Sequence, residues 1–418
     1  MALACQRNSY LRELKSKVKS CVPVETTLVT NGKKGKVKGY EVILEDTVLF
    51  PEGGGQPDDR GTINDIDVLR ITRKGAEAVH FVSTEIPEAT EVDMKVDWTR
   101  RFDHMQQHTG QHLITALAEQ MFGCPTTSWC LGEKTSFIEL DIPTLTEEDV
   151  AKLEESVNEN ILAGIPVTPH VFEDKNDPKL KEYRCRGLPE DHVGPVRVLD
   201  IEGIDGGTLC CGTHVSNLSH LQLIKFLFAE KGKKNKTNLH FVAGSRLRNY
   251  MTRSVKTERS LTGLLKGPLD QHFELADKAV KGFKTCQKNV SNLLKDLAVL
   301  EAQKYKSQTD PDPLFVLHRK EGDIDFMNIV VREINDKAVS CLLTVGDDMK
   351  GAGLFLLSGR EEILKDVGPR IAEVMDGKGS TNRGNFQGKV NKLGQRHKAE
   401  KLFREFLQPT PQQTVNEN

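Results

Sequence analysis

The sequence lacks any long hydrophobic run and carries almost no net charge. No apolar segment approaches the roughly 20 residues needed to cross a bilayer. The N-terminal MALACQRNSYLRELKSK also contains no apolar stretch of signal-peptide length. The formal net charge is −2, so the chain as a whole has no electrostatic attraction to nucleic acid. We therefore expect a cytosolic protein with no membrane partner.

The cysteine pattern also excludes a disulfide scaffold. The chain has nine cysteines, an odd number with scattered spacing. In a cytosolic protein this pattern favours free thiols, with a metal ligand among them. Hydrophobic residues make up 37% of the chain and charged residues 28%, which is the balance of a folded globular protein.

Positive charge is nevertheless concentrated in two clusters, which can bind phosphate backbones. The first cluster consists of Lys231, Lys233, Lys234, Lys236, Arg246, Arg248 and Arg253. The second consists of Arg383, Lys389, Lys392, Arg396, Lys398, Lys401 and Arg404. We interpret the second cluster as a solvated face or a disordered tail, because it lies at the polar C-terminal end.

The 418 residues are too many for one ordinary core and predict two or three domains. Residues 1–97 are β-rich and predict an N-terminal β-barrel with a glycine-rich motif. Residues 98–253 predict an α+β domain, and residues 254–310 a helical arm and linker. Residues 311–418 predict a C-terminal α/β domain with a basic tail. The fold class is therefore α+β.

Two helices are expected in the second domain. From Thr99, apolar residues recur at helical spacing in TRRFDHMQQHTGQHLITALAEQMFG, and Gly123 is placed to end this helix. The segment TEEDVAKLEESVNENILAG predicts the other, which opens with a capping-box pattern of Thr146 with Glu148 in the first turn. In the first domain, YEVILEDTVLF alternates as a strand does and leads into PEGGGQPDDRG.

Two pairs of metal-ligating residue types have helical or turn spacing. His108 and His112 are four residues apart on the first helix, so their side chains project from nearly the same side. Cys210 and His214 have the same separation in the turn TLCCGTHVSN. One thiolate and three imidazoles form a tetrahedral set that suits Zn²⁺ better than Mg²⁺ or Ca²⁺. Cys211 is a competing thiol, and we prefer Cys210 for its spacing to His214.

This pattern differs from two common motifs. Thr109 stands where an H-E-x-x-H metalloprotease keeps its general-base Glu, so the helix itself supplies no base. The run Gly53, Gly54 and Gly55 lets backbone N–H groups approach a ligand, but no Lys-Ser/Thr follows it, which excludes a P-loop. From composition alone, a hairpin loop is the better explanation of the run.

Taken together, the motifs resemble one protein family. PEGGGQPDDRGTI, HTGQHLITAL, GPVRVLDIEG, LCCGTHVSN and HFVAGSRL resemble, in this order, the editing half of alanyl-tRNA synthetase and its freestanding AlaX relatives. GLFLLSG, VGPRIAEVMDGKG and NFQGK resemble the C-terminal tRNA-binding domain of the synthetase. The match runs over most of residues 40–390. The chain is identified as a member of the long-form AlaX family, and we expect the aminoacylation domain to be absent.

The resemblance implies a trans-editing hydrolase, an aminoacyl-tRNA deacylase whose partner is tRNA(Ala) mischarged with serine, chiefly, or glycine. It implies that residues 98–253 form a zinc-dependent editing domain with one Zn²⁺ per chain. Its ligands map onto His108, His112, Cys210 and His214.

The family's substrate-binding residues map less completely. Gly53, Gly54, Gly55 and Gln56 would lie near the aminoacyl group, and Thr127 or its neighbour Thr126 would read the serine hydroxyl. Where the family has CGGTH this chain has CCGTH, which adds a side chain at Cys211 and keeps the ligand spacing.

Two alternatives remain open at the level of sequence. A zinc-stabilised RNA-binding module without catalysis would use the same four ligands in a closed structural site. An editing hydrolase for another aminoacyl-tRNA is the other, because threonyl-tRNA synthetase has a related editing domain. The alternating charges of residues 255–305 indicate a structural arm or a homodimer surface.

Overall fold

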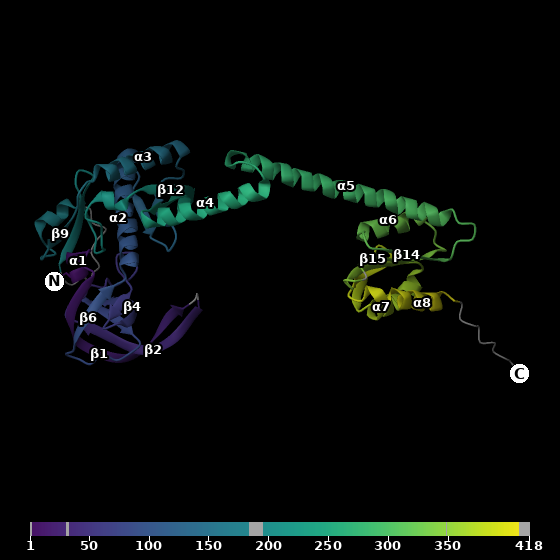
Figure 1. Ribbon diagram of the computed structural model, residues 1–418, viewed down its shortest axis with the longest axis horizontal. Coiled ribbons are helices and arrows are strands. Elements are labelled where there is room, and N and C mark those ends of the chain that lie inside the picture. Colours follow the sequence, from purple (N-terminus) through teal and green to yellow (C-terminus); the bar gives the residue numbers. More distant parts are fainter. Residues whose placement is uncertain (1, 31–32, 184–194, 348, 409–418) are drawn as a thin grey trace. The chain divides into compact units, whose positions relative to one another are not determined.

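The computed structural model describes residues 2–30, 33–183, 195–347 and 349–408. By its internal contacts the chain divides into two compact units, Met1–Ser260 and Leu261–Asn418. Figure 1 shows the elements of each unit, coloured along the sequence. Among the described residues, no helix is both long and apolar enough to span a membrane, and the eight described cysteines are all free. Cys185 and the last ten residues of the predicted basic tail lie outside the described residues.

Six strands at the N-terminus form a closed barrel in the order β1-β2-β5-β4-β3-β6. Their bounds are β1 Glu13–Thr30, β2 Lys33–Leu44, β3 Gly61–Ile63, β4 Ile66–Lys74, β5 Glu77–Val82 and β6 Glu91–Val96. Antiparallel pairing of β1 with β6 completes the ring. Alternate side chains fill its interior, with Val42, Ile71 and Met94 fully buried, as the period of two requires.

The strand expected over residues 40–50 is shorter than predicted. β2 ends at Leu44, and the chain after it leaves the sheet. Val48, Leu49 and Phe50 are nevertheless buried. Their apolar pattern therefore reflects burial of an irregular segment and not strand pairing.

The long helix α2, Trp98–Phe122, follows the barrel directly. The side chain of Asp97 caps its first turn by accepting a hydrogen bond from the Arg100 N–H, and Gly123 ends it in the left-handed conformation with φ 63°. Most of α2 is buried, because elements of the α+β domain surround it. The predicted end at Gly123 is confirmed, and the helix begins at Trp98, one residue before the predicted Thr99.

The rest of the first unit packs around α2 (Figure 1). One sheet has the order β12-β13-β8-β7 and the other β11-β10-β9. The bounds are β7 Thr126–Cys130, β8 Ser136–Leu140, α3 Glu147–Ala163, β9 Val167–Phe172, β10 Val196–Ile201, β11 Asp205–Leu209, β12 Ile224–Lys231 and β13 Thr237–Ala243. Helix α3 does begin with a capping box, but the partner of Thr146 is Asp149 and not the predicted Glu148. Asp149 holds the third helical position, from which a side chain reaches back to the cap.

Two helices occupy the segment predicted as an arm, α4 Ser245–Leu265 and α5 His272–Lys306. The C-terminal unit then forms one sheet in the order β14-β15-β16-β18-β17. Its elements are β14 Leu314–Arg319, α6 Ile324–Ile334, β15 Ser340–Gly346, β16 Gly353–Ser358, α7 Glu361–Val374, β17 Gly377–Asn382, β18 Asn385–Val390 and α8 Arg396–Leu407.

The C-terminal tail differs from our expectation in its described part. Residues predicted to be a solvated face or disordered tail form α8, and Ala399 and Phe403 of α8 are buried in the core of the unit. Four residues separate these two apolar side chains, so one face of α8 packs inward while its basic residues remain outside. The mixed α+β architecture is confirmed.

Candidate metal centre

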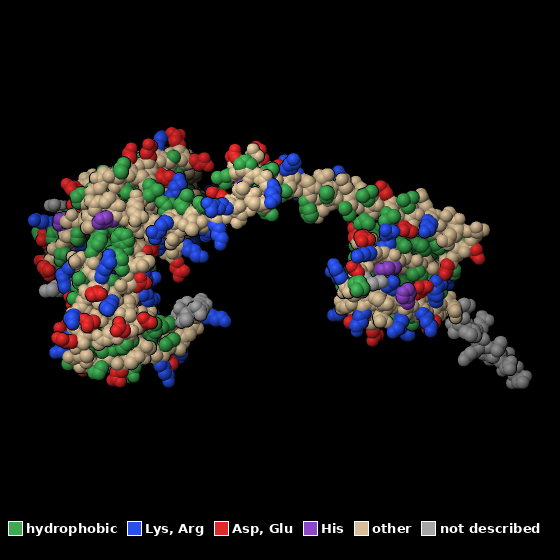
Figure 2. Space-filling model, in the orientation of Figure 1, with side chains coloured by type: hydrophobic (Ala, Val, Ile, Leu, Met, Phe, Trp, Pro, Cys, Tyr) green, Lys and Arg blue, Asp and Glu red, His purple; other side chains and the backbone are tan. Residues whose placement is uncertain are grey.

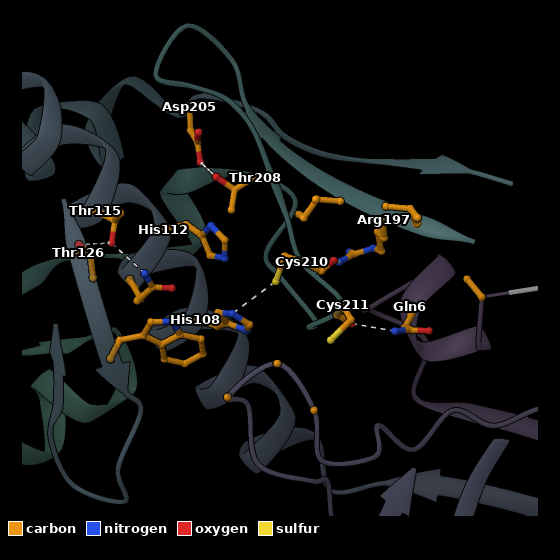
Figure 3. Close-up of a pocket in the computed structure, with 18 of the residues that line it drawn as sticks. Gln6, His108, His112, Thr115, Thr126, Arg197, Asp205, Thr208, Cys210 and Cys211 are labelled. Carbon is orange, nitrogen blue, oxygen red and sulfur yellow. Dashed lines mark hydrogen bonds between the residues drawn. The ribbon is translucent and has the colours of Figure 1, made fainter. Parts of the chain in front are cut away.

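The structure brings the four predicted metal ligands together. One ligand atom from each of His108, His112, Cys210 and His214 lies within 4.8 Å of the other three. Cys210 Sγ is 3.5 Å from His108 Nε2 and 3.2 Å from His214 Nε2. Helix α2 provides His108 and His112, one turn apart, and the loop after β11 provides Cys210 and His214. Figure 3 shows His108, His112 and Cys210 close together. All four side chains are buried together, which is the arrangement a chelating site needs.

A second layer of hydrogen bonds orients two of the imidazoles. Gln56 Oε1 lies 2.9 Å from His108 Nδ1, and Thr109 Oγ1 lies 3.1 Å from His214 Nδ1. When Nδ1–H donates to an oxygen, Nε2 keeps its lone pair and faces the cluster, which is the arrangement of metal-ligating histidines. Thr109, which stands where a metalloprotease keeps its Glu, thus supports a ligand instead.

Burial prepares three of the four groups, His108, Cys210 and His214, for a cation. It lowers the pKa of the His108 and His214 imidazoles well below the usual value, so both are neutral and able to coordinate. It also raises the pKa of the Cys210 thiol to about 12. A thiolate is stable here only beside a positive charge, which a divalent cation supplies. The donor set of three imidazoles and one thiol fits Zn²⁺.

The glycine-rich turn lies against the metal centre. Gly53 and Gln56 close it by exchanging backbone hydrogen bonds of 3.1 Å in both directions. Gly54 has φ +57° and a Cβ there would meet Cys211 Sγ at 2.8 Å. Gly55 has φ +80° and a Cβ would meet the Trp129 ring at 2.6 Å. Both the backbone conformation and the close packing therefore require glycine.

A cavity of about 830 Å³ opens beside the cluster and is lined by the three glycines together with His108, His112 and Cys210. Thr126 and Thr127 also line this cavity. The Thr127 hydroxyl donates to Glu139 Oε1 at 2.6 Å, whereas the Thr126 hydroxyl lies 3.0 Å from Thr115 Oγ1. The two candidate threonines are thus tied to different partners.

Gln56 lies elsewhere than predicted. It was expected to contact the substrate, but it is fully buried behind the ligands. Its oxygen faces His108 and the Thr213 N–H, and its Nε2 donates to Thr213 Oγ1 at 2.9 Å. Gln56 therefore positions His108 and the ligand loop and is not part of the cavity wall.

Several polar residues of the cavity were not predicted from the sequence, among them Gln111, Thr115, Arg197, Asp205 and Thr208. Figure 3 labels the last four. Gln111 and Thr115 lie three and seven residues after His108, so helical periodicity places them on the same side of α2. That signal was present in the sequence. Arg197 Nη1 donates to the Cys210 and Gly212 carbonyls at 3.2 and 2.6 Å. No local sequence pattern predicts these two hydrogen bonds.

The first basic cluster is partly a surface feature. Lys231, Lys233, Lys234 and Arg248 are exposed, and Figure 2 shows Lys and Arg side chains gathered over α4. Arg246 is an exception, because it is buried and pairs with Asp103 of α2 at 2.8 Å. This ion pair joins the start of α4 to α2. Arg246 is therefore not available for a phosphate backbone.

Comparison with known proteins gives consistent matches. The family model described as the "Threonyl and Alanyl tRNA synthetase second additional domain" matches residues 196–242. The Alanyl-tRNA editing protein Aarsd1 of Danio rerio is 53% identical over 405 residues, covering 97% of this chain and 98% of that protein. The putative alanyl-tRNA editing protein alaX of Saccharomyces cerevisiae is 28% identical over 442 residues, covering 94% of this chain and 93% of that protein.

Among solved structures, the C-Ala domain of alanyl-tRNA synthetase from Aquifex aeolicus aligns with 22% of this chain and 89% of that domain. The identity is 17% and the TM-score 0.20. A score this low supports no structural conclusion.

Proposed function

Because the chain belongs to the alanyl-tRNA editing protein family and is an aminoacyl-tRNA deacylase, we propose that it removes serine, and secondarily glycine, from mischarged tRNA(Ala) at the cavity beside the metal centre. The observation that carries this proposal is the cluster of His108, His112, Cys210 and His214, of which the first three also line the cavity. We further propose that it acts in the cytosol.

The reaction is hydrolysis of an ester. The oxygen of water adds to the aminoacyl carbonyl carbon, the bond from that carbon to the ribose oxygen breaks, and the ribose oxygen takes up a proton. A bound Zn²⁺, held by the four ligands, supplies Lewis-acid charge for polarising or positioning the ester. The helix offers no carboxylate base, since Thr109 orients His214 instead.

The protein's own residues bind and orient the substrate. The turn of Gly53, Gly54 and Gly55 lines the cavity without side chains and allows the ester to approach the backbone. Trp129 lies beside His108, with ring centroids 4.9 Å apart, and offers an aromatic face to the terminal base. The exposed lysines and arginines near α4 then supply charge for the tRNA backbone.

Selection against the correct product is the central requirement. Alanine differs from serine by one hydroxyl, and an apolar pocket separates such a pair by only about 10²-fold. A pocket that hydrogen-bonds the hydroxyl discriminates far more strongly, because its polar group is left unpaired by alanine. Polar side chains such as Thr126 and Thr127 line the cavity, which supports selection of this kind.

A deacylation assay tests the proposal directly. Single-turnover hydrolysis is measured for tRNA(Ala) carrying serine, glycine or alanine, with tRNA(Thr) carrying serine as a fourth substrate. We expect Ser-tRNA(Ala) to be cleaved fastest and Ala-tRNA(Ala) to be spared. Preference for tRNA(Thr) would favour an editing hydrolase of another specificity.

Removal of one ligand supplies the matched comparison. Loss of a residue that hydrogen-bonds to a metal ligand already lowers metal affinity or activity by up to about 100-fold, so Cys210→Ala should lose at least that much activity. Cys286→Ala is the control, since Cys286 is exposed on α5. The four protein ligands also suit a closed structural site in an RNA-binding module. Such a module would bind Ser-tRNA(Ala) and protect its ester, which the same assay detects.

A further inference from the structure

Gln111 presents an unusual buried group to the cavity. It lies on α2 immediately before the ligand His112, is 4% exposed and lines the cavity. Its Nε2 donates to Thr115 Oγ1 at 2.8 Å. Among the described residues, however, its Oε1 has no hydrogen-bond partner. A buried acceptor without a partner is unfavourable, which makes such a group in a binding cavity a candidate for ligand contact.

The neighbouring threonines fix the orientation of this amide. Thr115 Oγ1 accepts from Gln111 Nε2 at 2.8 Å, and the same oxygen lies 3.0 Å from Thr126 Oγ1, with which it shares a second hydrogen bond (Figure 3). Because the Gln111 Nε2 group is bonded to Thr115, the Gln111 Oε1 atom is the part of the amide that can bond to a ligand in the cavity. The side chain is thus preorganised as an acceptor, and no side chain of the described chain competes for it.

We propose that Gln111 Oε1 accepts a hydrogen bond from the side-chain hydroxyl of the mischarged serine and is the residue that distinguishes serine from alanine. This inference rests on the proposed editing of Ser-tRNA(Ala). Thr115 and Thr126 are positioning residues that act through Gln111. Thr126 therefore contributes to reading the hydroxyl indirectly, in contrast to the direct contact that the family resemblance implies.

The chemistry of the three amino acids fits one acceptor. Serine donates to Oε1, whereas the methyl group of alanine fills the same space and leaves Oε1 buried and unpaired. Glycine leaves that space open, so a water molecule can pair with Oε1. The α-ammonium is common to all three, and as a cation it is better matched by the carboxylates Asp205 and Glu119 in the same lining.

The test compares Gln111→Met with the wild-type chain on two substrates. Methionine keeps the length of the side chain and removes the acceptor. We expect the single-turnover rate on Ser-tRNA(Ala) to fall roughly 100-fold or more while the rate on Gly-tRNA(Ala) changes by less than about threefold, which moves the ratio of the two rates. Zinc content is measured in parallel. Gln120→Met is the control, because Gln120 is exposed on the same helix and donates to the Ile204 carbonyl.

A second variant distinguishes recognition of the serine hydroxyl from a loss of packing around Gln111. Thr115→Val removes the hydroxyl that holds the amide and keeps the side-chain shape, so it should lower the serine rate selectively and by a smaller factor. Parallel losses on both substrates in Gln111→Met, or an unchanged serine rate, would overturn the inference. A wild-type chain that cleaves Gly-tRNA(Ala) but not Ser-tRNA(Ala) would overturn the proposed serine editing, and this inference with it.

Discussion

Gln56 Oε1 lies 2.9 Å from His108 Nδ1 and also accepts from the Thr213 N–H at 2.9 Å. One amide oxygen thus links a histidine of α2 to the loop that carries Cys210 and His214. The glycine-rich turn, which provides Gln56, is in this way coupled to both halves of the metal centre.

The first prediction follows from this contact. Gln56→Leu removes the oxygen that orients His108 and should weaken zinc affinity about 10- to 100-fold, with deacylation falling in the same range. Zinc affinity is measured by competition with a chromophoric chelator. Gln120→Leu, on the exposed side of α2, serves as control and should leave the affinity unchanged. Equal zinc affinities in the Gln56→Leu and Gln120→Leu variants would show that Gln56 does not orient a zinc ligand.

The two glycines of the turn and of the barrel offer a matched pair. Gly54 has φ +57° with Cys211 Sγ in the way of a Cβ, and Gly75 has φ +60° with nothing within 4 Å. Alanine at either position should cost about 1–2 kcal/mol of unfolding free energy from backbone strain. Only Gly54→Ala should also slow deacylation, because its methyl group meets Cys211 at the cavity wall. Comparable activity in both variants would show that the turn tolerates a side chain there.

A buried ion pair attaches the start of α2 to the barrel. Arg101 Nε lies 2.9 Å from Asp59 Oδ2, both side chains have no exposed surface, and Arg101 Nη2 also donates to the Val48 carbonyl at 2.6 Å. Asp59→Asn leaves the guanidinium uncompensated and should cost about 3–5 kcal/mol. Asp93→Asn, whose partner Lys15 is largely exposed, should cost less than about 1 kcal/mol.

Urea denaturation followed by tryptophan fluorescence measures this difference. Both tryptophans of the chain, Trp98 and Trp129, belong to the first unit, so the signal reports that unit alone. If the two asparagine variants unfold at the same urea concentration, the buried pair does not anchor α2.

The barrel contains a pH-sensitive group in His80. The ring is fully buried, with Nδ1 donating to the Val42 carbonyl and Nε2 facing the Thr47 hydroxyl, and burial lowers its pKa from 6.5 to about 4. Above pH 6.5 the ring is neutral in both states. As the pH falls from 6.5 to about 4, only the unfolded state takes up the proton, so about 3 kcal/mol of stability is lost.

Urea denaturation of the wild-type chain and His80→Gln at several pH values tests this loss. Glutamine cannot be protonated, so the variant should lack this part of the pH dependence while it keeps the rest. Identical slopes between pH 6.5 and 4 in both proteins would exclude His80 as the cause.

The sequence predicted the clustering of His108, His112, Cys210 and His214 because the two patterns that contain them are local. His108 and His112 have helical spacing, and Cys210 and His214 share one turn, so two short patterns contain the whole set. Gly123 is likewise a local signal, which ends α2. The capping partner of Thr146 was misassigned by one position, since Glu148 and Asp149 are both acidic and only geometry separates them.

The features of the fold and the site that were not predicted depend on tertiary contacts, which local sequence patterns do not indicate. From the sequence, Arg246 was assigned to a basic surface cluster. Its ion pair with Asp103 is apparent only in the folded structure. The α8 segment is mostly basic in sequence, so the burial of Ala399 and Phe403 was not predicted. These two side chains join the core of the C-terminal unit in the folded chain. Similarly, the unpaired oxygen of Gln111 is a property of the assembled cavity and of no sequence motif.

The central claim is that His108, His112, Cys210 and His214 bind one zinc ion on which deacylation depends. Zinc X-ray absorption spectroscopy of the purified full chain, combined with Ser-tRNA(Ala) hydrolysis before chelation, after chelation and after zinc is restored, tests it most directly. We expect one zinc per chain with three nitrogen ligands and one sulfur ligand, and activity that is lost and regained with the metal. Full hydrolysis by the zinc-free chain, or a zinc environment without sulfur, would contradict it.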